Sequence, residues 1–144
     1  MAIQIIDYGT SEYEKMVSLR YQVLRKSLNL EFKENELEKD KDDILIGCFE
    51  SDKIMGCCIL TKVNNDTMRL RQMAVNSGLQ GKGVGRAILI FAESIASDFG
   101  YKKMIMHARV NALGFYKKLG YTTFGNEFTE VTLPHFMMEK KLKR

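Results

Sequence analysis

Proline is almost absent from this sequence, and tryptophan is missing. Of 144 residues only Pro134 is proline. Linkers between domains tend to be rich in proline, glycine or serine, and we find no such stretch, no internal repeat and no low-complexity segment. We therefore expect a single domain over residues 1–144, a length that can bury a sizeable core.

Cysteine is also scarce. The sequence has three cysteines, Cys48, Cys57 and Cys58, and none of them forms a Cys-x-x-Cys pair. The odd number and the spacing argue against a disulfide framework and against a zinc site. The cysteines lie in apolar, strand-like segments, and no base accompanies them in a pattern that predicts a catalytic thiol. We expect reduced core cysteines in a cytoplasmic protein, and no metal site.

Long hydrophobic runs and blocks of one charge are missing as well. No segment approaches the length of a transmembrane helix, and the first ten residues, MAIQIIDYGT, lack the features of a signal peptide. The net charge is +4 with scattered basic residues, whereas nucleic-acid binders more often carry a concentrated basic stripe. We expect neither a membrane nor a nucleic-acid partner, and we expect the dense run Lys140–Arg144 to be a solvated end of the chain.

Hydrophobic periodicity predicts strands and helices in mixed order, with hairpins early and βαβ units later. The fold class is therefore α+β, or mixed α/β. The expected strands cover residues 2–7, 44–50, 53–63, 67–75, 102–108, 121–124 and 136–142. The expected helices cover residues 13–28, a short exposed piece of 29–43, 84–99 and 111–119.

Two helices carry signals at their ends. Ser11 and Glu14 have the spacing of a capping box at the start of the first helix. Arg20 falls on or near the apolar stripe of that helix, where it could bind a substrate carboxylate, although we expect it to extend to water. Gly100 is expected to end the helix over 84–99. The apolar face expected for that helix comprises Val84, Ala87, Ile88, Phe91, Ala92, Ile95 and Phe99.

The strand over residues 67–75 has an inconsistent alternation. Met68 and Leu70 share one parity, whereas Met73 and Val75 share the other. Because strand side chains alternate with a period of two, one residue is expected to be inserted near position 71 or 72 as a β-bulge. A strand buried on both faces would explain the pattern equally well.

A glycine-rich stretch, QGKGVG, spans residues 80–85 ahead of an apolar helix. It fits neither the dinucleotide fingerprint nor the Walker pattern. Glycines nevertheless let backbone N–H groups approach an anion, and the helix that follows presents unpaired N–H groups and a positive dipole end. With Lys82 and Arg86 adding charge, the stretch suits a diphosphate. The alternative is a flexible strand-to-helix turn with solvated cations.

QGKGVG matches the Gln/Arg-x-x-Gly-x-Gly/Ala signature of the GCN5-related N-acetyltransferases (GNAT). ARVNALGFYKKLGY, residues 108–121, resembles the second motif of that family, in which a short helix carries Phe-Tyr before a Gly-Tyr/Phe turn. LRYQVLRKSL and GNEFTEVTLPHFMMEKKL are similar to the first helix and the C-terminal segment of the ElaA-like or YjcF-like bacterial subgroup. The resemblance covers nearly the whole chain.

The resemblance implies a central mixed, mostly antiparallel sheet of about six to seven strands with about four helices. It also implies an N-acetyltransferase that moves an acetyl group from acetyl-CoA directly to the amine of an unidentified small-molecule or peptide acceptor, as a monomer or a homodimer. A non-catalytic CoA-binding or regulatory domain with the same fold is the alternative. The residues implied to hold the cofactor are Met73, Ala74, Val75, Gln80, Gly81, Lys82, Gly83, Val84, Gly85, Arg86, Arg109, Asn111, Phe115 and Tyr116.

The resemblance also implies catalytic residues. Tyr116 matches the usual acid of the family, although it could be a core tyrosine. Glu130 and His135 are candidates for the base, although the first could be plain surface charge and the second a structural hydrogen bonder. Many members carry Asn seven residues before the tyrosine, where this chain has Arg109; Asn111 follows two residues later. Arg109 could instead meet a phosphate or an acidic substrate.

Overall fold

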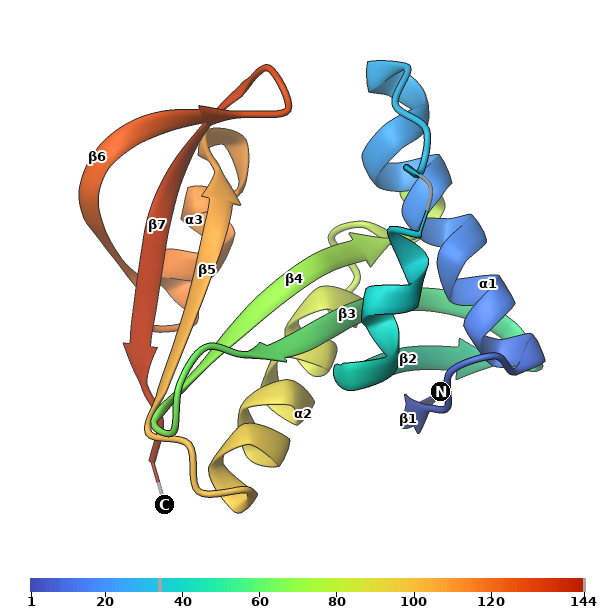
Figure 1. Ribbon diagram of the computed structural model, residues 1–144, viewed down its shortest axis with the longest axis horizontal. Coiled ribbons are helices and arrows are strands. Elements are labelled where there is room, and N and C mark those ends of the chain that lie inside the picture. The colour runs from blue at the N-terminus through green and yellow to red at the C-terminus, as the bar shows by residue number, and fades with distance from the viewer. Residues whose placement is uncertain (34, 144) are drawn as a thin grey trace. The chain divides into compact units, whose positions relative to one another are not determined.

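The structure is a computed structural model that describes residues 1–33 and 35–143 (Figure 1). Strands and helices are interspersed along the chain. The strands are β1 (Ala2–Ile6), β2 (Ile44–Glu50), β3 (Lys53–Lys62), β4 (Thr67–Val75), β5 (Lys103–Arg109), β6 (Thr122–Glu130) and β7 (Leu133–Lys141). The α-helices are α1 (Ser11–Arg20), α2 (Val84–Asp98) and α3 (Leu113–Lys118). Short π or 3-10 helices are η1 (Tyr21–Arg25), η2 (Lys26–Leu28), η3 (Leu37–Asp42), η4 (Ser77–Leu79) and η5 (Val110–Ala112).

The seven strands follow one another across the sheet in the order β1-β2-β3-β4-β5-β7-β6. β4 and β5 run parallel, whereas β1–β2, β2–β3, β5–β7 and β6–β7 are antiparallel pairs. A parallel pair needs a crossover connection, which α2 supplies between β4 and β5. The expected mixed, mostly antiparallel sheet is confirmed. Within the described residues, no helix combines the length and the apolar character needed to cross a membrane.

The chain forms two compact units. One comprises residues 1–61 and 72–92, and the other comprises residues 62–71 and 93–144. Each unit is therefore built from two separate segments, and the boundaries fall at the end of β3, inside β4 and inside α2. The single domain expected from the sequence stays a prediction.

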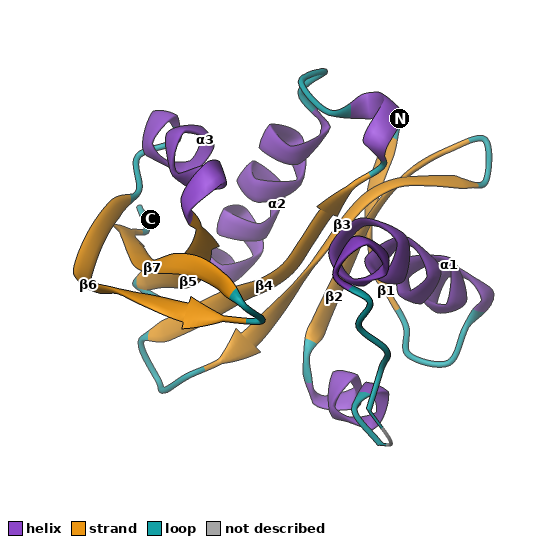
Figure 2. Ribbon diagram, turned by 90° about the horizontal axis from the view of Figure 1, so that it is seen from above, coloured by secondary structure: helices purple, strands orange, loops and turns teal. Residues whose placement is uncertain are grey.

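The core of the first unit lies between α1 and strands β1 to β3, and Figure 2 shows α1 across these strands. Tyr13, Met16 and Leu19 project from one side of α1 at helical spacing. They join a buried cluster that also contains Ile6, Leu45, Phe49, Cys57, Ile59 and Ala74. Cys48, Cys57 and Cys58 are all buried and free of disulfides, as expected.

The start of α1 differs from the expectation. The helix is capped by Thr10, whose hydroxyl accepts a hydrogen bond from the Tyr13 N–H at 3.2 Å, so the predicted Ser11 capping box is wrong. The hydroxyl of Ser11 instead donates to the neighbouring Glu12 carboxylate. Both residues can cap a helix, and the sequence alone did not distinguish two such residues in succession.

A buried ion pair joins α1 to η3. Arg20 is 1% exposed, and its Nη1 lies 2.8 Å from Oδ2 of Asp40, which is 2% exposed. Tyr13 donates its hydroxyl to the same oxygen at 2.6 Å. Burial, reinforced by this hydrogen bond to Asp40, raises the pKa of Tyr13. The expectation that Arg20 extends to water is wrong, because a carboxylate brought in by η3 compensates the guanidinium inside the protein.

The second unit contains β5, β7 and β6 in adjacent positions, with β7 in the middle. Met104, Met106 and Ala108 alternate as the buried residues of β5, and Met138 of β7 is fully buried. β6 is mostly exposed, as an edge strand with one face to water would be. The register of the β6–β7 pair shifts between Phe124 and Phe128, around Gly125 in β6.

The predicted end of the helix at Gly100 is confirmed, and α3 ends in the same way. Gly100 has a φ of 92° at the end of α2, and Gly120 has a φ of 96° after α3. The left-handed conformation suits glycine at both positions. The apolar face predicted for α2 is only partly right, because Phe99 is 60% exposed whereas Leu89 and Ala96 are buried.

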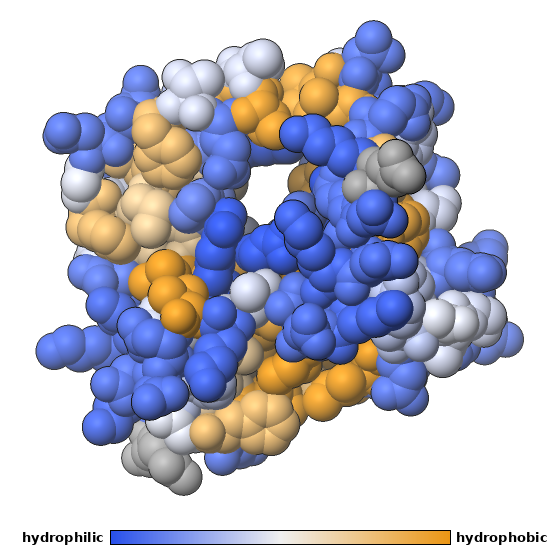
Figure 3. All heavy atoms as spheres, viewed as in Figure 1, coloured by the Kyte–Doolittle hydropathy of each residue, from blue (hydrophilic) through white to orange (hydrophobic). Residues whose placement is uncertain are grey.

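Hydrophilic side chains cover most of the face in Figure 3, with the apolar ones in separate groups.

We predict that Asp40→Ala lowers the free energy of unfolding by roughly 3–5 kcal/mol, because it leaves the Arg20 charge buried without its carboxylate. Asp42→Ala, an exposed change in the same short helix, should cost less than about 0.5 kcal/mol. Urea denaturation measures both. The double variant Arg20→Met, Asp40→Leu should recover part of the loss. Equal losses for the two single variants would contradict a stabilising role for the ion pair.

Candidate functional site

β4 has an irregular backbone just before the glycine-rich stretch. Gln72 has a φ of 54°, a left-handed value that is uncommon for a residue with a side chain. Its carbonyl oxygen lies 3.7 Å from Sγ of Cys57. The irregularity therefore falls at one of the two positions that the sequence indicated. Met73 and Val75 are half-buried, and Ala74 between them is 1% exposed.

The segment after β4 turns sharply at two glycines. Gly81 has a φ of 82° and Gly83 has a φ of 87°. A Cβ atom added at either position would meet nothing within 4 Å. The backbone conformation, and not lack of space, therefore favours glycine at these two positions. The loop is open on the side to which a side chain would project, which leaves room for a ligand to approach the backbone.

The loop leads into the first turn of α2. The first bond of that helix runs from the Ala87 N–H to the Gly83 carbonyl at 3.0 Å, so the N–H groups of residues 84–86 precede the helical ladder. Lys82 and Arg86 are exposed. Unpaired N–H groups, the positive end of the helix dipole and two cations make this terminus suitable for a diphosphate.

Two contacts hold the loop in place within the first unit. The side-chain amide of Gln80 donates to the Val75 carbonyl at 3.4 Å, so this amide ties the loop to the end of β4. The first turn of α2 also packs closely on β3 at Gly56. A Cβ atom at this position would lie 2.7 Å from Ile88 Cδ1 and 3.0 Å from Val84 Cγ1.

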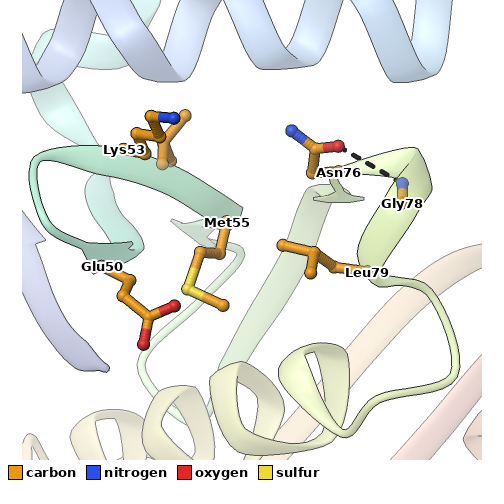
Figure 4. Close-up of a pocket in the computed structure, with 7 residues that line it drawn as sticks. Glu50, Lys53, Met55, Asn76, Gly78 and Leu79 are labelled. Carbon is orange, nitrogen blue, oxygen red and sulfur yellow. Dashed lines mark hydrogen bonds between the residues drawn. The ribbon is translucent and has the colours of Figure 1, made fainter.

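A shallow hollow of about 300 Å³ lies beside the loop, where β3 begins (Figure 4). Met55 and Leu79 give it apolar walls, and Asn76 accepts a hydrogen bond from the Gly78 N–H at 3.3 Å. Glu50 and Lys53 add one charge of each sign. None of the residues expected to bind a cofactor lines this hollow, so it supports the loop without enlarging the candidate site.

In the second unit, one carboxylate lies between two imidazoles. Oε1 of Glu130 is 2.9 Å from Nδ1 of His107, and its Oε2 is 3.7 Å from Nε2 of His135. Phe128 stacks on His135 and meets His107 edge-on. Burial opposes ionisation of Glu130, but the neighbouring His107, His135 and Arg69 together outweigh it and hold the pKa of this carboxyl below the ordinary value. Glu130 is therefore an ionised carboxylate at neutral pH.

The two histidines differ in their surroundings. Nδ1 of His135 lies 2.9 Å from the Leu133 carbonyl, which can only accept, so this nitrogen carries a proton. His135 is 3% exposed, whereas the His107 side chain is 23% exposed and Glu130 is 41% exposed. Glu130 is therefore the member of the group that an incoming molecule could reach most easily.

The remaining predicted residues lie at or near α3. Tyr116 is 7% exposed and meets the rings of Phe115 and Tyr121 edge-on. Phe115 is 39% exposed. Arg109 ends β5 and immediately precedes η5, in which Asn111 is exposed. The structure thus places the predicted residues in two sets, one in each unit: the end of β4 with the glycine loop, and β5 to β7 with α3.

Two residues of this group, Arg69 and Phe128, could not be predicted from the sequence. Arg69 Nη2 lies 3.0 Å from Nδ1 of His107, a contact that depends on the parallel pairing of β4 with β5. Phe128 contacts both histidine rings, and the register of β6 on β7 places it opposite His135. No local sequence signal marks either contact. Among the described residues, no group of three or more His, Cys, Asp or Glu side chains is placed to hold a metal ion.

Comparisons with known sequences point to one family. The family model of the acetyltransferase (GNAT) domain matches residues 8–142. An uncharacterised N-acetyltransferase of Bacillus subtilis, YjcF, is 29% identical over 125 residues, which cover 85% of this chain and 87% of that protein. Two other B. subtilis relatives are each 30% identical to this chain, over 58% and 56% of its residues. The matched regions make up only 56% and 54% of those two proteins, so this chain spans about half of their length.

Solved structures share the fold. ElaA of Escherichia coli superposes with a TM-score of 0.84 at 16% identity, with coverage of 97% of this chain and 99% of ElaA. A GNAT family acetyltransferase of Elizabethkingia anophelis with acetyl-CoA bound gives 0.76 at 17% identity, with coverage of 98% and 97%. At such low identity these likenesses concern the fold alone.

We predict that Gly81→Ala lowers the free energy of unfolding by about 1–2 kcal/mol, because the left-handed conformation is unfavourable for alanine. Gly78→Ala is the matched control: it lies in the same segment, has open space around it and has no left-handed φ. The control should change stability by less than about 0.5 kcal/mol in urea denaturation. An equal loss for both variants would show that the loop conformation does not depend on Gly81.

Proposed function

Because this chain belongs to the acetyltransferase (GNAT) family, we propose that it transfers an acetyl group from acetyl-CoA to the amine of a small-molecule or peptide acceptor. The observation that carries the proposal is the loop with Gly81 and Gly83 in left-handed conformations at the start of α2. Its open backbone and the helix terminus behind it offer what a diphosphate requires. The acetyl-CoA present in the related E. anophelis structure supports the same cofactor.

In this proposal the CoA diphosphate accepts hydrogen bonds from the backbone of residues 80–85, with Lys82 and Arg86 contributing charge. The pantetheine arm pairs with the backbone of residues 73–75 as an added strand would. The left-handed Gln72 supports this role, because an irregular residue redirects the backbone groups that follow it. Arg109, Asn111 and Phe115 are proposed as further cofactor contacts.

The reaction is a direct transfer. The lone pair of the neutral amine forms a C–N bond to the thioester carbonyl carbon, and the C–S bond breaks to release the CoA thiolate. Backbone N–H groups at the end of β4 would stabilise the developing oxyanion. We propose that the Tyr116 hydroxyl donates its proton to the departing thiolate.

The attacking amine must also lose a proton. We propose that Glu130 and His135 take part in removing this proton. The Glu130 carboxylate lies between the imidazoles of His107 and His135. Glu130 is ionised and the most exposed of the three. It can therefore attract the ammonium form of the acceptor and receive its proton.

We predict that acetyl-CoA and CoA, but not NAD or ATP, stabilise the protein in a thermal-shift assay. Saturation at 100 times the dissociation constant adds about 2.7 kcal/mol of stability, which is enough to detect. Gly83→Ala should reduce the shift, because it alters the backbone that holds the diphosphate, whereas Gly78→Ala should retain it. If none of these ligands shifts the wild type at millimolar concentration, the loop is a structural turn and the proposal fails.

We predict that Tyr116→Phe lowers kcat by about 100-fold or more, because it removes a general acid, while the thermal shift with acetyl-CoA is unchanged. Tyr101→Phe removes a hydroxyl outside the candidate site and should leave kcat unchanged. CoA release during turnover of a primary-amine panel is the measurement. An unaltered kcat in Tyr116→Phe would exclude this role, and CoA binding without turnover by the wild type would favour a non-catalytic CoA-binding domain.

A further inference from the structure

His107 of β5 lies between two charged groups that impose opposite requirements on one nitrogen. Its Nδ1 is 3.0 Å from Nη2 of Arg69 on β4 and 2.9 Å from Oε1 of Glu130 on β6. A guanidinium can only donate a hydrogen bond, and an ionised carboxylate can only accept one. An imidazole nitrogen either carries a hydrogen or offers a lone pair, so it cannot satisfy both neighbours at once.

Each protonation state leaves one of the two contacts unfavourable. When Nδ1 is bare, that is, carries no hydrogen, Arg69 donates a hydrogen bond to it. The lone pair of Nδ1 then also faces the carboxylate of Glu130. With Nδ1 protonated, it donates to Glu130, but its hydrogen faces the donor of Arg69. Arg69 cannot give up its proton at physiological pH, so it favours the bare nitrogen. His107 Nδ1 and Glu130 Oε1 then lie 2.9 Å apart with no hydrogen between them. At this distance one incoming proton can complete a hydrogen bond between the two atoms.

The surrounding contacts hold the His107 ring in this position. Phe128 meets the ring edge-on at a centroid distance of 5.3 Å. Two sheet registers fix the backbone: β4 pairs with β5 with Arg69 opposite Ile105, and β5 pairs with β7 with His107 opposite Met137. A single slip in either register would turn the side chains to the other face. The arrangement of the three groups is therefore a property of the fold.

We propose that His107 is the final acceptor of the proton that the amine loses, at Nδ1, and that Arg69 is a positioning residue that keeps this nitrogen bare before each transfer. The inference rests on the proposed acetyltransferase function. Glu130, 41% exposed, meets the ammonium group first, and His107 stands behind it.

The step is balanced in protons and electrons. An N–H bond of the ammonium group breaks and its electrons become the lone pair that forms the C–N bond, while this proton passes through the Glu130 carboxylate to His107, where an Nδ1–H bond forms. The second proton, which the nitrogen loses once the C–N bond has formed, replaces the one that Tyr116 gives to the thiolate. Nδ1 then donates to Glu130, and the hydrogen bond from Arg69 is given up. Exchange with water removes the proton from the imidazole and restores the Arg69 contact, which resets the site.

Other charged groups near His107 do not duplicate this role. His135 of β7 has its Nδ1 committed to the Leu133 carbonyl. Arg71 lies close enough to Arg69 on β4 to lower the Arg69 pKa, although burial is the larger cause. Arg109, two residues further along β5, carries a group that cannot accept a proton. Of the two histidines, His107 presents a nitrogen within hydrogen-bond distance of the Glu130 carboxylate, at 2.9 Å, whereas His135 Nε2 lies 3.7 Å away.

The test uses the fact that the chain has two histidines. Long-range proton–nitrogen NMR at about pH 8, where an ordinary imidazole is neutral, reports which nitrogen of each ring carries the hydrogen. We expect His107 to carry it on Nε2 and His135 to carry it on Nδ1, with His107→Gln giving the assignment. Arg69→Met should move the His107 hydrogen to Nδ1, since Glu130 then acts unopposed. A wild-type His107 protonated at Nδ1, or no change in Arg69→Met, would overturn the proposal.

Matched variants guard against misfolding and against a purely structural effect. Lys103→Met removes another cation from β5, one that pairs at 3.5 Å with Glu139, and it should leave the His107 tautomer unchanged. If Arg69→Met does not fold, Glu130→Gln serves instead. Its amide N–H should donate to the bare Nδ1 and so keep the Nε2–H form, whereas an Nδ1–H form in this variant would overturn the role of Arg69.

A kinetic measurement tests the role in catalysis. With acetyl-CoA saturating, His107→Gln should lower kcat by about 100-fold or more while the thermal shift with acetyl-CoA persists. An unchanged kcat would overturn the proposal even if the tautomers agree with it. If the wild type transfers acetyl to no amine of the panel, the proposed function fails and the catalytic role fails with it, but the tautomer measurement still decides whether Arg69 controls Nδ1.

Discussion

The first turn of α2 can lie on β3 only because residue 56 has no side chain. A Cβ atom there would come within 2.7 Å of Ile88 Cδ1 and 3.1 Å of the Ala74 carbonyl oxygen, so these neighbours would have to shift in a closely packed interior. This close approach fixes where the helix begins. The position of the N–H groups that follow Gly83 depends on it, and so does the geometry of the loop that those groups complete.

In the second unit, the strand registers play the corresponding role. Arg69, His107 and Glu130 come from three strands and are far apart in the sequence, yet their side chains meet within 3.0 Å. The parallel pair β4–β5 brings the first two together, and the β6–β7 hairpin supplies the third. Binding and proton-transfer functions would thus depend on different kinds of constraint: glycine conformations and helix packing in one unit, and sheet pairing in the other.

The sequence predicted the features that depend on local chemistry. Gly81, Gly83 and Gly100 adopt left-handed conformations where turns or a helix end were expected, and the irregularity of β4 falls at a predicted position. Features that depend on tertiary contacts were missed or misjudged. Arg20 was expected to reach water because its partner, Asp40, lies twenty residues away, and Arg69 carried no signal because its contact requires the β4–β5 pairing.

The three cysteines have a practical consequence for enzymology. Cys48, Cys57 and Cys58 have no exposed surface, and burial raises the pKa of all three, to about 12 for Cys57. A thiol that stays protonated and enclosed does not react with disulfide dyes. If the protein catalyses the proposed transfer, such a dye added to the folded protein reports the CoA that is released, without a background from the protein. The same dye would register the protein thiols only after unfolding, so one reagent can follow both turnover and loss of the native state.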